Sequence, residues 1–149
     1  MGLLGNLINR IFNSSPPKST VAPTGYFEFD EFDKNGKKQL KICKMSVSNM
    51  VGANSDIAQT ALKQIKVGEQ VLLEANLKGK ENSSVKVKNT AGVQIGWLKN
   101  GQNLEDHKYR YDIFERLENG TTVLARVYSK EQLKNGKTTI LIDVARYAK

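Results

Sequence analysis

Apolar and polar residues alternate along much of the chain from residue 26 onward. Alternation with a period of two is typical of β-strands that bury one face and expose the other. Asn-Gly pairs at residues 35–36, 100–101, 119–120 and 135–136 indicate turns, because both residue types tolerate positive φ angles. The pattern predicts strands over residues 26–32, 38–48, 70–76, 83–89, 93–98, 121–129 and 138–147.

Two segments follow helical spacing instead. Residues 55–65 and 104–117 carry apolar residues three and four positions apart, which predicts two amphipathic helices. We expect Ser55 to cap the first helix, since a serine side chain accepts hydrogen bonds from free N–H groups at a helix start. The expected inward residues are Ile57, Ala61, Leu62 and Ile65 in the first helix, and Tyr111, Phe114 and Leu117 in the second.

The first 25 residues are predicted to be separate from the folded domain of residues 26–149. Residues 1–12 predict an amphipathic helix, and residues 13–25 predict a linker that holds all three prolines of the chain. Such a helix is too short to span a bilayer, which takes about 20 residues. It either folds back onto its own domain or contacts a partner, a membrane surface or a second copy of the chain. Its apolar stripe consists of Leu3, Leu4, Leu7, Ile8, Ile11 and Phe12.

The composition adds a charge imbalance to this picture. The 149 residues, which fit one domain with a tail, include 23 Lys and Arg against 15 Asp and Glu, a net charge of +8. A basic protein attracts polyanions such as nucleic acid or an anionic membrane face. Positive charge is also explained by solubility alone, so charge by itself does not choose a partner.

Residue types that carry catalysis or bind metals are scarce. Cys43 is the single cysteine and His107 the single histidine, so neither a disulfide nor a zinc site of four Cys and His ligands is expected. Cys43 lies in an alternating run, where burial as a small apolar side chain is expected. There is no Gly-rich phosphate loop. The sequence therefore predicts a protein without catalytic residues, cofactor or metal, located in the reducing cytoplasm or peripherally at a membrane.

The middle of the chain contains an ordered set of short motifs. A helix ends before Val67-Gly68, and a strand and an Asn-containing loop lead to the strand Val85-Lys86-Val87, then to Ile95-Gly96-Trp97-Leu98 and a second helix. This order resembles the HIRAN domain over residues 45–128. The resemblance implies a mainly β fold, an OB-like barrel of six to seven strands with two helices. It also implies binding of single-stranded DNA, at its 3′ end, through the face of the barrel.

Two parts of the family pattern are missing from this sequence. Residues 48–52 lack the family's aromatic pair, and residues 79–82 lack its Tyr and Asp. Contacts along the phosphate backbone are then expected in place of recognition of the strand's end. The candidate residues are basic, aromatic or polar, and they lie on strands, in loops or in the second helix. In that helix, basic and aromatic residues alternate over 108–111, and we expect them on one face. The candidate residues are Lys78, Lys80, Asn82, Lys86, Lys88, Trp97, Lys99, Tyr109 and Arg110.

Trp97, the only tryptophan, has two interpretations. Core packing is favoured, because strand residues alternate faces and Ile95 should share its side. The alternative is a platform on which a base stacks.

Two functions remain after these observations. The first is a non-catalytic module that binds single-stranded nucleic acid through a basic barrel face. The second is an adaptor for a protein, a membrane surface or a second copy of the chain, acting through the apolar residues of segment 3–12.

Overall fold

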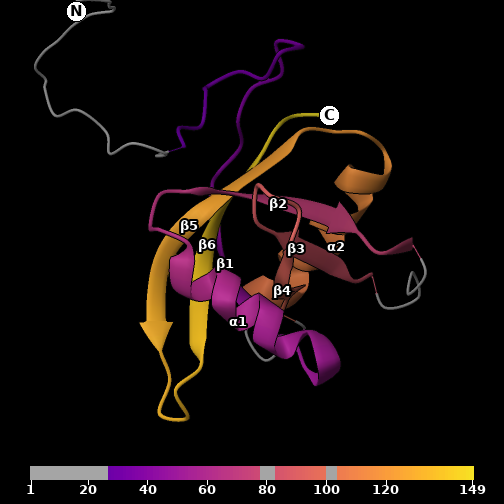
Figure 1. Cartoon of the computed structure of the whole chain (residues 1–149). Helices are drawn as coiled ribbons and strands as arrows, with labels where there is room; N and C mark the ends of the chain where they lie inside the picture. The colour runs from indigo at the N-terminus through magenta and orange to yellow at the C-terminus, as the bar shows by residue number, and fades with distance from the viewer. Residues whose placement is uncertain (1–26, 78–82, 100–103) are drawn as a thin grey trace, which may run out of the picture.

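The strands pair side by side and close into a barrel (Figure 1). The computed structural model describes residues 27–77, 83–99 and 104–149. Within these residues six antiparallel strands form a ring in the order β1-β4-β3-β2-β5-β6, so the prediction of a barrel with two helices is confirmed. The strands are β1 (Cys43–Ser48), β2 (Gln70–Ala75), β3 (Val85–Lys88), β4 (Gln94–Leu98), β5 (Val123–Gln132) and β6 (Thr138–Arg146).

The first and last strands of the ring are neighbours. Cys43 of β1 pairs with Val144 of β6, and Met45 pairs with Ile142. On its other side β1 pairs with β4, where Val47 lies opposite Leu98. The ring therefore closes through residues that are distant in the sequence.

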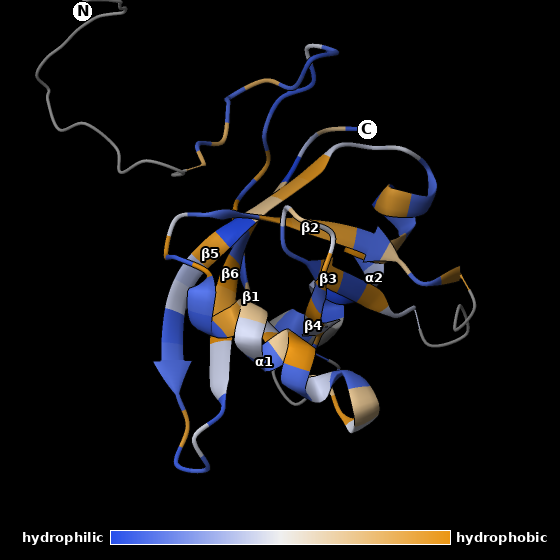
Figure 2. Ribbon diagram, viewed as in Figure 1, coloured by the Kyte–Doolittle hydropathy of each residue, from blue (hydrophilic) through white to orange (hydrophobic). Residues whose placement is uncertain are grey.

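Hydrophobic and hydrophilic residues follow one another along the strands (Figure 2), and the buried positions of the strands are mostly apolar. On β3, Val85 and Val87 are fully buried, while Lys86 and Lys88 point outward. Met45 and Ile142 occupy the centre of the core from β1 and β6. The outward positions differ in exposure: Lys86 and Lys88 are partly exposed, whereas Asp143 of β6 is 7% exposed and pairs with Arg126 of β5.

Helix α1 (Ser55–Gln64) packs against the barrel through Ala58, Ala61 and Leu62. Two expectations for it are wrong. Ile57 is 60% exposed, because the smaller Ala58 takes the inward position and lets the helix approach β4 and β6. Ser55 is the first residue of the helix and not its cap, since a 3-10 turn, η2 (Gly52–Asn54), precedes it.

Helix α2 (Leu104–Glu118) contributes Ile113 and Phe114 to the same core. Its inward stripe continues to Leu117, which packs against the core as expected. Tyr111, expected on this stripe, is 55% exposed. Tyr111 lies three residues before Phe114, which would place the two on one helix face, but it lies only two residues before Ile113. The buried face is centred between Ile113 and Phe114, and Tyr111 falls just outside it.

The segment before β1 is not a pair of strands, as the alternation had predicted. Only single bridges occur there, between Phe32 and Lys38 and between Gln39 and Tyr147. The turn expected at residues 35–36 is present, with Gly36 at a φ of 76°. The carboxylate of Asp33 accepts hydrogen bonds from the backbone N–H groups in this turn, and most side chains around it are exposed. Without a buried face, the alternation produces no regular strand.

Several predictions concern residues outside the described ranges. They are the helix of residues 1–12 with its apolar stripe, the linker of residues 13–25, the turn at residues 100–101, and the contacts proposed for Lys78, Lys80 and Asn82. Among the described residues, no helix is long and apolar enough to cross a membrane.

Candidate nucleic-acid interface

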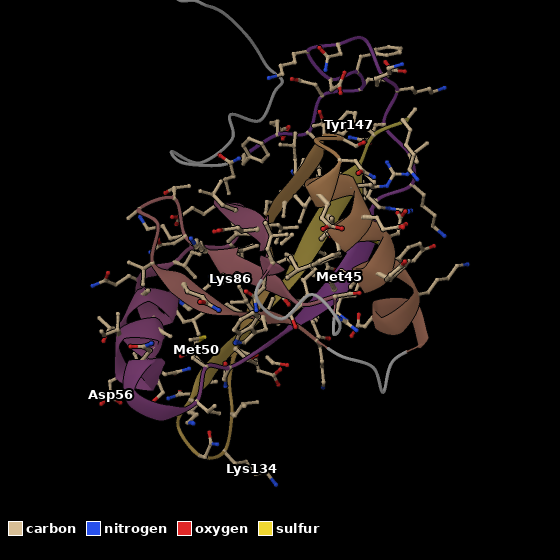
Figure 3. All side chains as sticks on the ribbon, turned by 90° about the vertical axis from the view of Figure 1, so that its right-hand side faces the viewer. Met45, Met50, Asp56, Lys86, Lys134 and Tyr147 are labelled. Carbon is tan, nitrogen blue, oxygen red and sulfur yellow. The ribbon has the colours of Figure 1, made fainter. Side chains whose placement is uncertain are left out.

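One row of residues crosses three strands on the outside of the barrel. Lys86 of β3 lies opposite Trp97 of β4, and Trp97 lies opposite Ser48 of β1. Residues directly opposite each other in antiparallel strands share a face of the sheet. All three side chains are partly exposed, and Trp97 is not part of the buried core cluster. The outer face of the barrel therefore presents the indole ring of Trp97 between the ammonium group of Lys86 and the hydroxyl of Ser48. Figure 3 labels Lys86 on this face and, for orientation, Met45 in the core.

A β-bulge turns Trp97 to the outside. The register between β3 and β4 shifts, so that Val87 lies opposite Gly96 and Lys88 lies opposite Gln94. Ile95 is the extra residue, and both Ile95 and Gly96 are buried. Because two successive residues point inward, the next one points outward. The expectation that Trp97 shares the side of Ile95 in the core is therefore wrong.

Gly96 allows β4 to approach β1 closely at this row. A Cβ atom at Gly96 would lie 2.3 Å from the backbone oxygen of Ser48 and 2.6 Å from Cγ1 of Val47. Both distances are far shorter than a van der Waals contact, so only glycine fits. The close approach fixes Trp97 beside Ser48.

The lysines near Trp97 differ in what they contact. The ammonium group of Lys88 forms an ion pair with Glu74 of β2. The hydrogen bond from Lys88 lowers the pKa of Glu74, and the charges of Lys88 and Lys86 lower it further. Lys99 follows β4 two residues after Trp97, is exposed, and donates its backbone N–H to the oxygen of Ser46 at 2.9 Å. Glu74 also lies directly opposite Lys86 in the register of β2 and β3. Lys86, opposite Trp97, and Lys99, two residues after it, are the cations placed to accompany Trp97.

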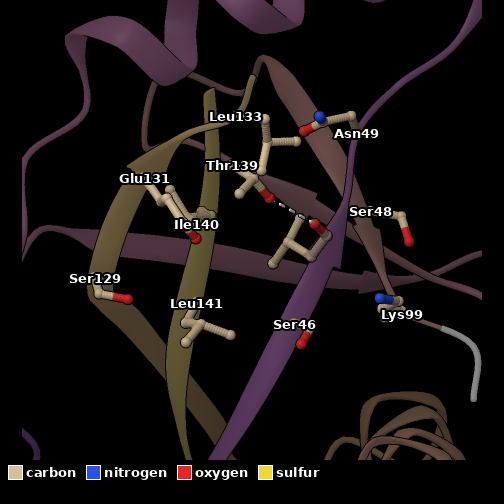
Figure 4. A pocket seen from close by; sticks show the side chains of 11 residues that line it. Ser46, Ser48, Asn49, Lys99, Ser129, Glu131, Leu133, Thr139, Ile140 and Leu141 are labelled. Atoms are coloured by element: carbon tan, nitrogen blue, oxygen red, sulfur yellow. Dashed lines mark hydrogen bonds between the residues drawn. The ribbon is translucent and has the colours of Figure 1, made fainter. Parts of the chain in front are cut away.

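A groove opens beside this row, where β1 and β6 separate. Their pairing ends at Ser46 and Leu141, although both strands continue. Beyond that point the hydroxyl of Thr139 donates to the backbone oxygen of Val47 at 3.3 Å. The resulting groove has a volume of about 400 Å³, and Figure 4 shows its opening between β1 and the β5–β6 hairpin.

Both walls of the groove carry polar groups, and its deepest residues are apolar. Ser48 and Lys99 line the wall formed by β1 and β4. Glu131 lines the wall formed by the hairpin. Val47 and Ile140, which are buried in the core, form the floor. The groove therefore offers apolar contact below and one charge of each sign on opposite walls.

Helix α1 holds the hairpin wall in position. The side chain of Gln59 accepts a hydrogen bond from the backbone N–H of Thr138 at 2.7 Å and donates one to its carbonyl at 3.0 Å. The ammonium group of Lys130 donates to the carbonyl oxygens of Lys63 and Ile65, both at 2.8 Å. Two of these bonds join the middle of α1 to the start of β6, and the other two join the end of α1 to β5.

Two candidate residues lie elsewhere. Arg110 is only 8% exposed and donates to the backbone oxygen of Ser83 at 2.6 Å, and its burial lowers its pKa. Tyr109 packs against the core, with the guanidinium of Arg146 4.4 Å from its ring centre. The expected single face of residues 108–111 is wrong, because successive helix residues are rotated by about 100°. Neither Arg110 nor Tyr109 belongs to the row of Trp97.

The structure thus brings together three of the expected site residues, Lys86, Trp97 and Lys99, and places Lys88 beside them in an ion pair. Sequence reasoning missed the groove. Its walls meet through Thr139 and Val47, which are 92 residues apart in the chain. The only signal in the sequence is the outward pair of hydroxyls at Ser46 and Ser48, and many exposed strands carry such residues.

Comparisons with known proteins give little further information. No protein-family model matches the chain, and no curated protein matches it either. A solved structure of a protein from Lactobacillus plantarum is similar over 70% of this chain and 98% of that chain, with 15% sequence identity and a TM-score of 0.45. A likeness of this degree carries no conclusion about fold or function.

Proposed function

We propose that this protein is a non-catalytic module that binds single-stranded nucleic acid along the outer face of β3, β4 and β1. The observation that carries the proposal is the position of Trp97, turned outward between Lys86 and Ser48. Proteins that bind single strands without sequence preference combine aromatic side chains, on which bases stack, with cations that follow the phosphates. This face supplies both.

Other features of the chain support this proposal. The net charge of +8 favours a polyanionic ligand. The resemblance of residues 45–128 to the HIRAN domain, an OB-like module, suggests the same class of ligand. Since the aromatic pair and the Tyr and Asp of that family are missing, we propose binding along the strand in place of recognition of its 3′ end.

The test is fluorescence anisotropy with labelled single-stranded oligonucleotides. Stacking of one base on an aromatic ring is worth about 1–3 kcal/mol, so Trp97→Ala should weaken binding by about five- to 150-fold. Trp97→Phe, which keeps an aromatic ring, should retain most of the affinity. Both variants should unfold at nearly the wild-type temperature, because Trp97 lies outside the core cluster.

Charge reversal tests the electrostatic part. Each phosphate contact adds about 0.7 to the slope of log affinity against log salt concentration for single strands, so Lys86→Glu with Lys99→Glu should reduce the slope by about 1.4. Lys34→Glu with Lys37→Glu, two exposed positions in the turn before β1, is the matched control for two charge reversals. Absence of binding at low salt, where charge attraction is strongest, would refute the proposal and favour the adaptor function of residues 3–12.

A further inference from the structure

We infer that the groove between β1 and the β5–β6 hairpin holds one base of the bound strand, and that it selects bases with an exocyclic amino group over thymine and uracil. The inference rests on the proposed function and adds sequence preference to it. Three properties of the groove support it: its position, its distribution of charge, and the hydrogen-bonding capacity of Glu131.

The groove adjoins the stacking surface. Ser48 is both the cross-strand neighbour of Trp97 and part of the groove wall. Lys99 also lines the groove, two residues after Trp97 in the sequence. A strand that stacks one base on Trp97 therefore passes the mouth of the groove with its neighbouring nucleotide.

The size and the floor of the groove suit a flat ring. Its volume of about 400 Å³ lies in the range of sites for small ligands, about 300–1,000 Å³. Val47 and Ile140 provide apolar contact for the ring. The hydrogen bonds from Gln59, Lys130 and Thr139 hold the walls in place, so little ordering is required when the base enters.

The two charges orient the nucleotide. A phosphate is attracted to the ammonium group of Lys99 and repelled by the carboxylate of Glu131 on the opposite wall. The backbone of the strand therefore stays on the Lys99 side, and the base points toward Glu131.

Glu131 then decides which bases are accepted. An ionised carboxylate can only accept hydrogen bonds. Adenine, cytosine and guanine carry amino groups that donate, and a carboxylate paired with the amino group of cytosine is a known form of base readout. Thymine and uracil have one ring N–H between two carbonyl oxygens, and those oxygens are repelled by the same carboxylate.

The experiment compares the affinities for dA, dC and dT oligonucleotides of equal length, measured by anisotropy for the wild type and two variants. The wild type should bind dA and dC at least about tenfold more tightly than dT, the lower end of the effect of one hydrogen bond to a charged group. Glu131→Gln should reduce this ratio to about one, because a carboxamide also donates to the carbonyl oxygens of thymine. Glu118→Gln, an exposed position at the end of α2, is the matched control and should keep the wild-type ratio.

Loss of the negative charge in Glu131→Gln strengthens binding to every sequence. The readout is therefore the ratio of the affinity for dA or dC to the affinity for dT, and not the affinity itself. Trp97→Ala should weaken binding to all three oligonucleotides alike and leave the ratio unchanged. Equal wild-type affinities for dA, dC and dT, or a preference that persists in Glu131→Gln, would overturn the inference and leave the proposed function standing. Failure to bind any oligonucleotide would refute the proposed function itself.

Discussion

At Gly96 the barrel has no room for a side chain. Any Cβ there would collide with the backbone of Ser48 and the side chain of Val47. Because the first of these atoms belongs to the backbone, the collision cannot be relieved by a change of rotamer. The strands β1 and β4 would have to move apart at the row that positions Trp97.

We therefore predict that Gly96→Ala lowers the free energy of unfolding by about 1–3 kcal/mol, the usual cost of overpacking. Urea denaturation measures the effect. Gly36→Asn is the control, since Gly36 has open space around it and Asn tolerates its positive φ angle. A Gly96→Ala variant as stable as the wild type would show that β1 and β4 can separate without cost.

The outward position of Trp97 could not be read from the sequence. Lys86 and Val87 follow the expected alternation, and each lies on its predicted face. On β4 the same rule fails, because Ile95 is an extra residue that has no partner in the register of β3. A glycine within a strand indicates a bulge or a close backbone approach, and both occur at Gly96. The glycine does not indicate which of its neighbours turns outward.

At the scale of elements, Asp112 joins α2 to the last strand. Its carboxylate accepts hydrogen bonds from Arg146 of β6 at 2.6 Å and from Arg116 of α2 at 2.9 Å. Burial raises the pKa of Asp112, but the hydrogen bonds and charges of Arg146 and Arg116 outweigh it, so the pKa lies below its ordinary value of 3.8. The ionised form is therefore the one that stabilises the fold.

We predict that Asp112→Asn lowers the free energy of unfolding at pH 6 by about 1.5–3 kcal/mol, the range for hydrogen bonds to charged groups. Because the folded pKa is depressed, this stabilisation is present above the unfolded pKa and is lost as the pH falls through the folded pKa. The difference between wild type and variant should thus shrink below about pH 4. Urea unfolding of the wild type and Asp112→Asn at pH 6 and pH 3 measures this difference in the free energy of unfolding. Glu118→Gln, on the same helix, is the control. A difference that stays the same at both pH values would contradict the prediction.

The positions of the strands and helices along the sequence were more predictable than the direction, inward or outward, of each residue in them. Every strand of the barrel and both helices lie within the predicted ranges or within a few residues of them, because burial imposes periods of two and 3.6 on the sequence. The faces of the helices were less certain, as Ile57 and Tyr111 show, since Ile57 lies one position from Ala58 and Tyr111 two positions from Ile113, both of which are buried. Contacts with the barrel decide between such neighbours, and the sequence of the helix alone does not contain them.

At the scale of the whole molecule, the barrel of residues 43–146 closes on itself, and the buried residues of the core cluster described above lie between Cys43 and Val144. We therefore predict that a chain that begins at residue 26 folds by itself and keeps the unfolding temperature of the full chain. Differential scanning calorimetry of both chains measures this. A lower unfolding temperature of the shorter chain would show that residues 1–25 contribute to the fold.

The same pair of chains separates the two candidate functions. Retention of the shorter chain on a single-stranded DNA resin is expected, because Lys86, Trp97 and Lys99 are all present in it. If only the full chain is retained, residues 1–25 carry the interaction. The barrel was predictable as a whole, whereas the groove was not, because its walls come from strands at opposite ends of the sequence.

The pairing of β1 with β6 also affects how the protein is made. Cys43 donates through its sulfur to the carbonyl oxygen of Val144, which lies 101 residues later in the chain. A ribosome adds about 5–20 residues per second, so β1 is synthesised about 5–20 s before its partner. During that time one edge of β1 has no strand beside it, and unpaired edges are templates for association with other chains. Until β6 has been synthesised, this edge of β1 is therefore open to association with other chains.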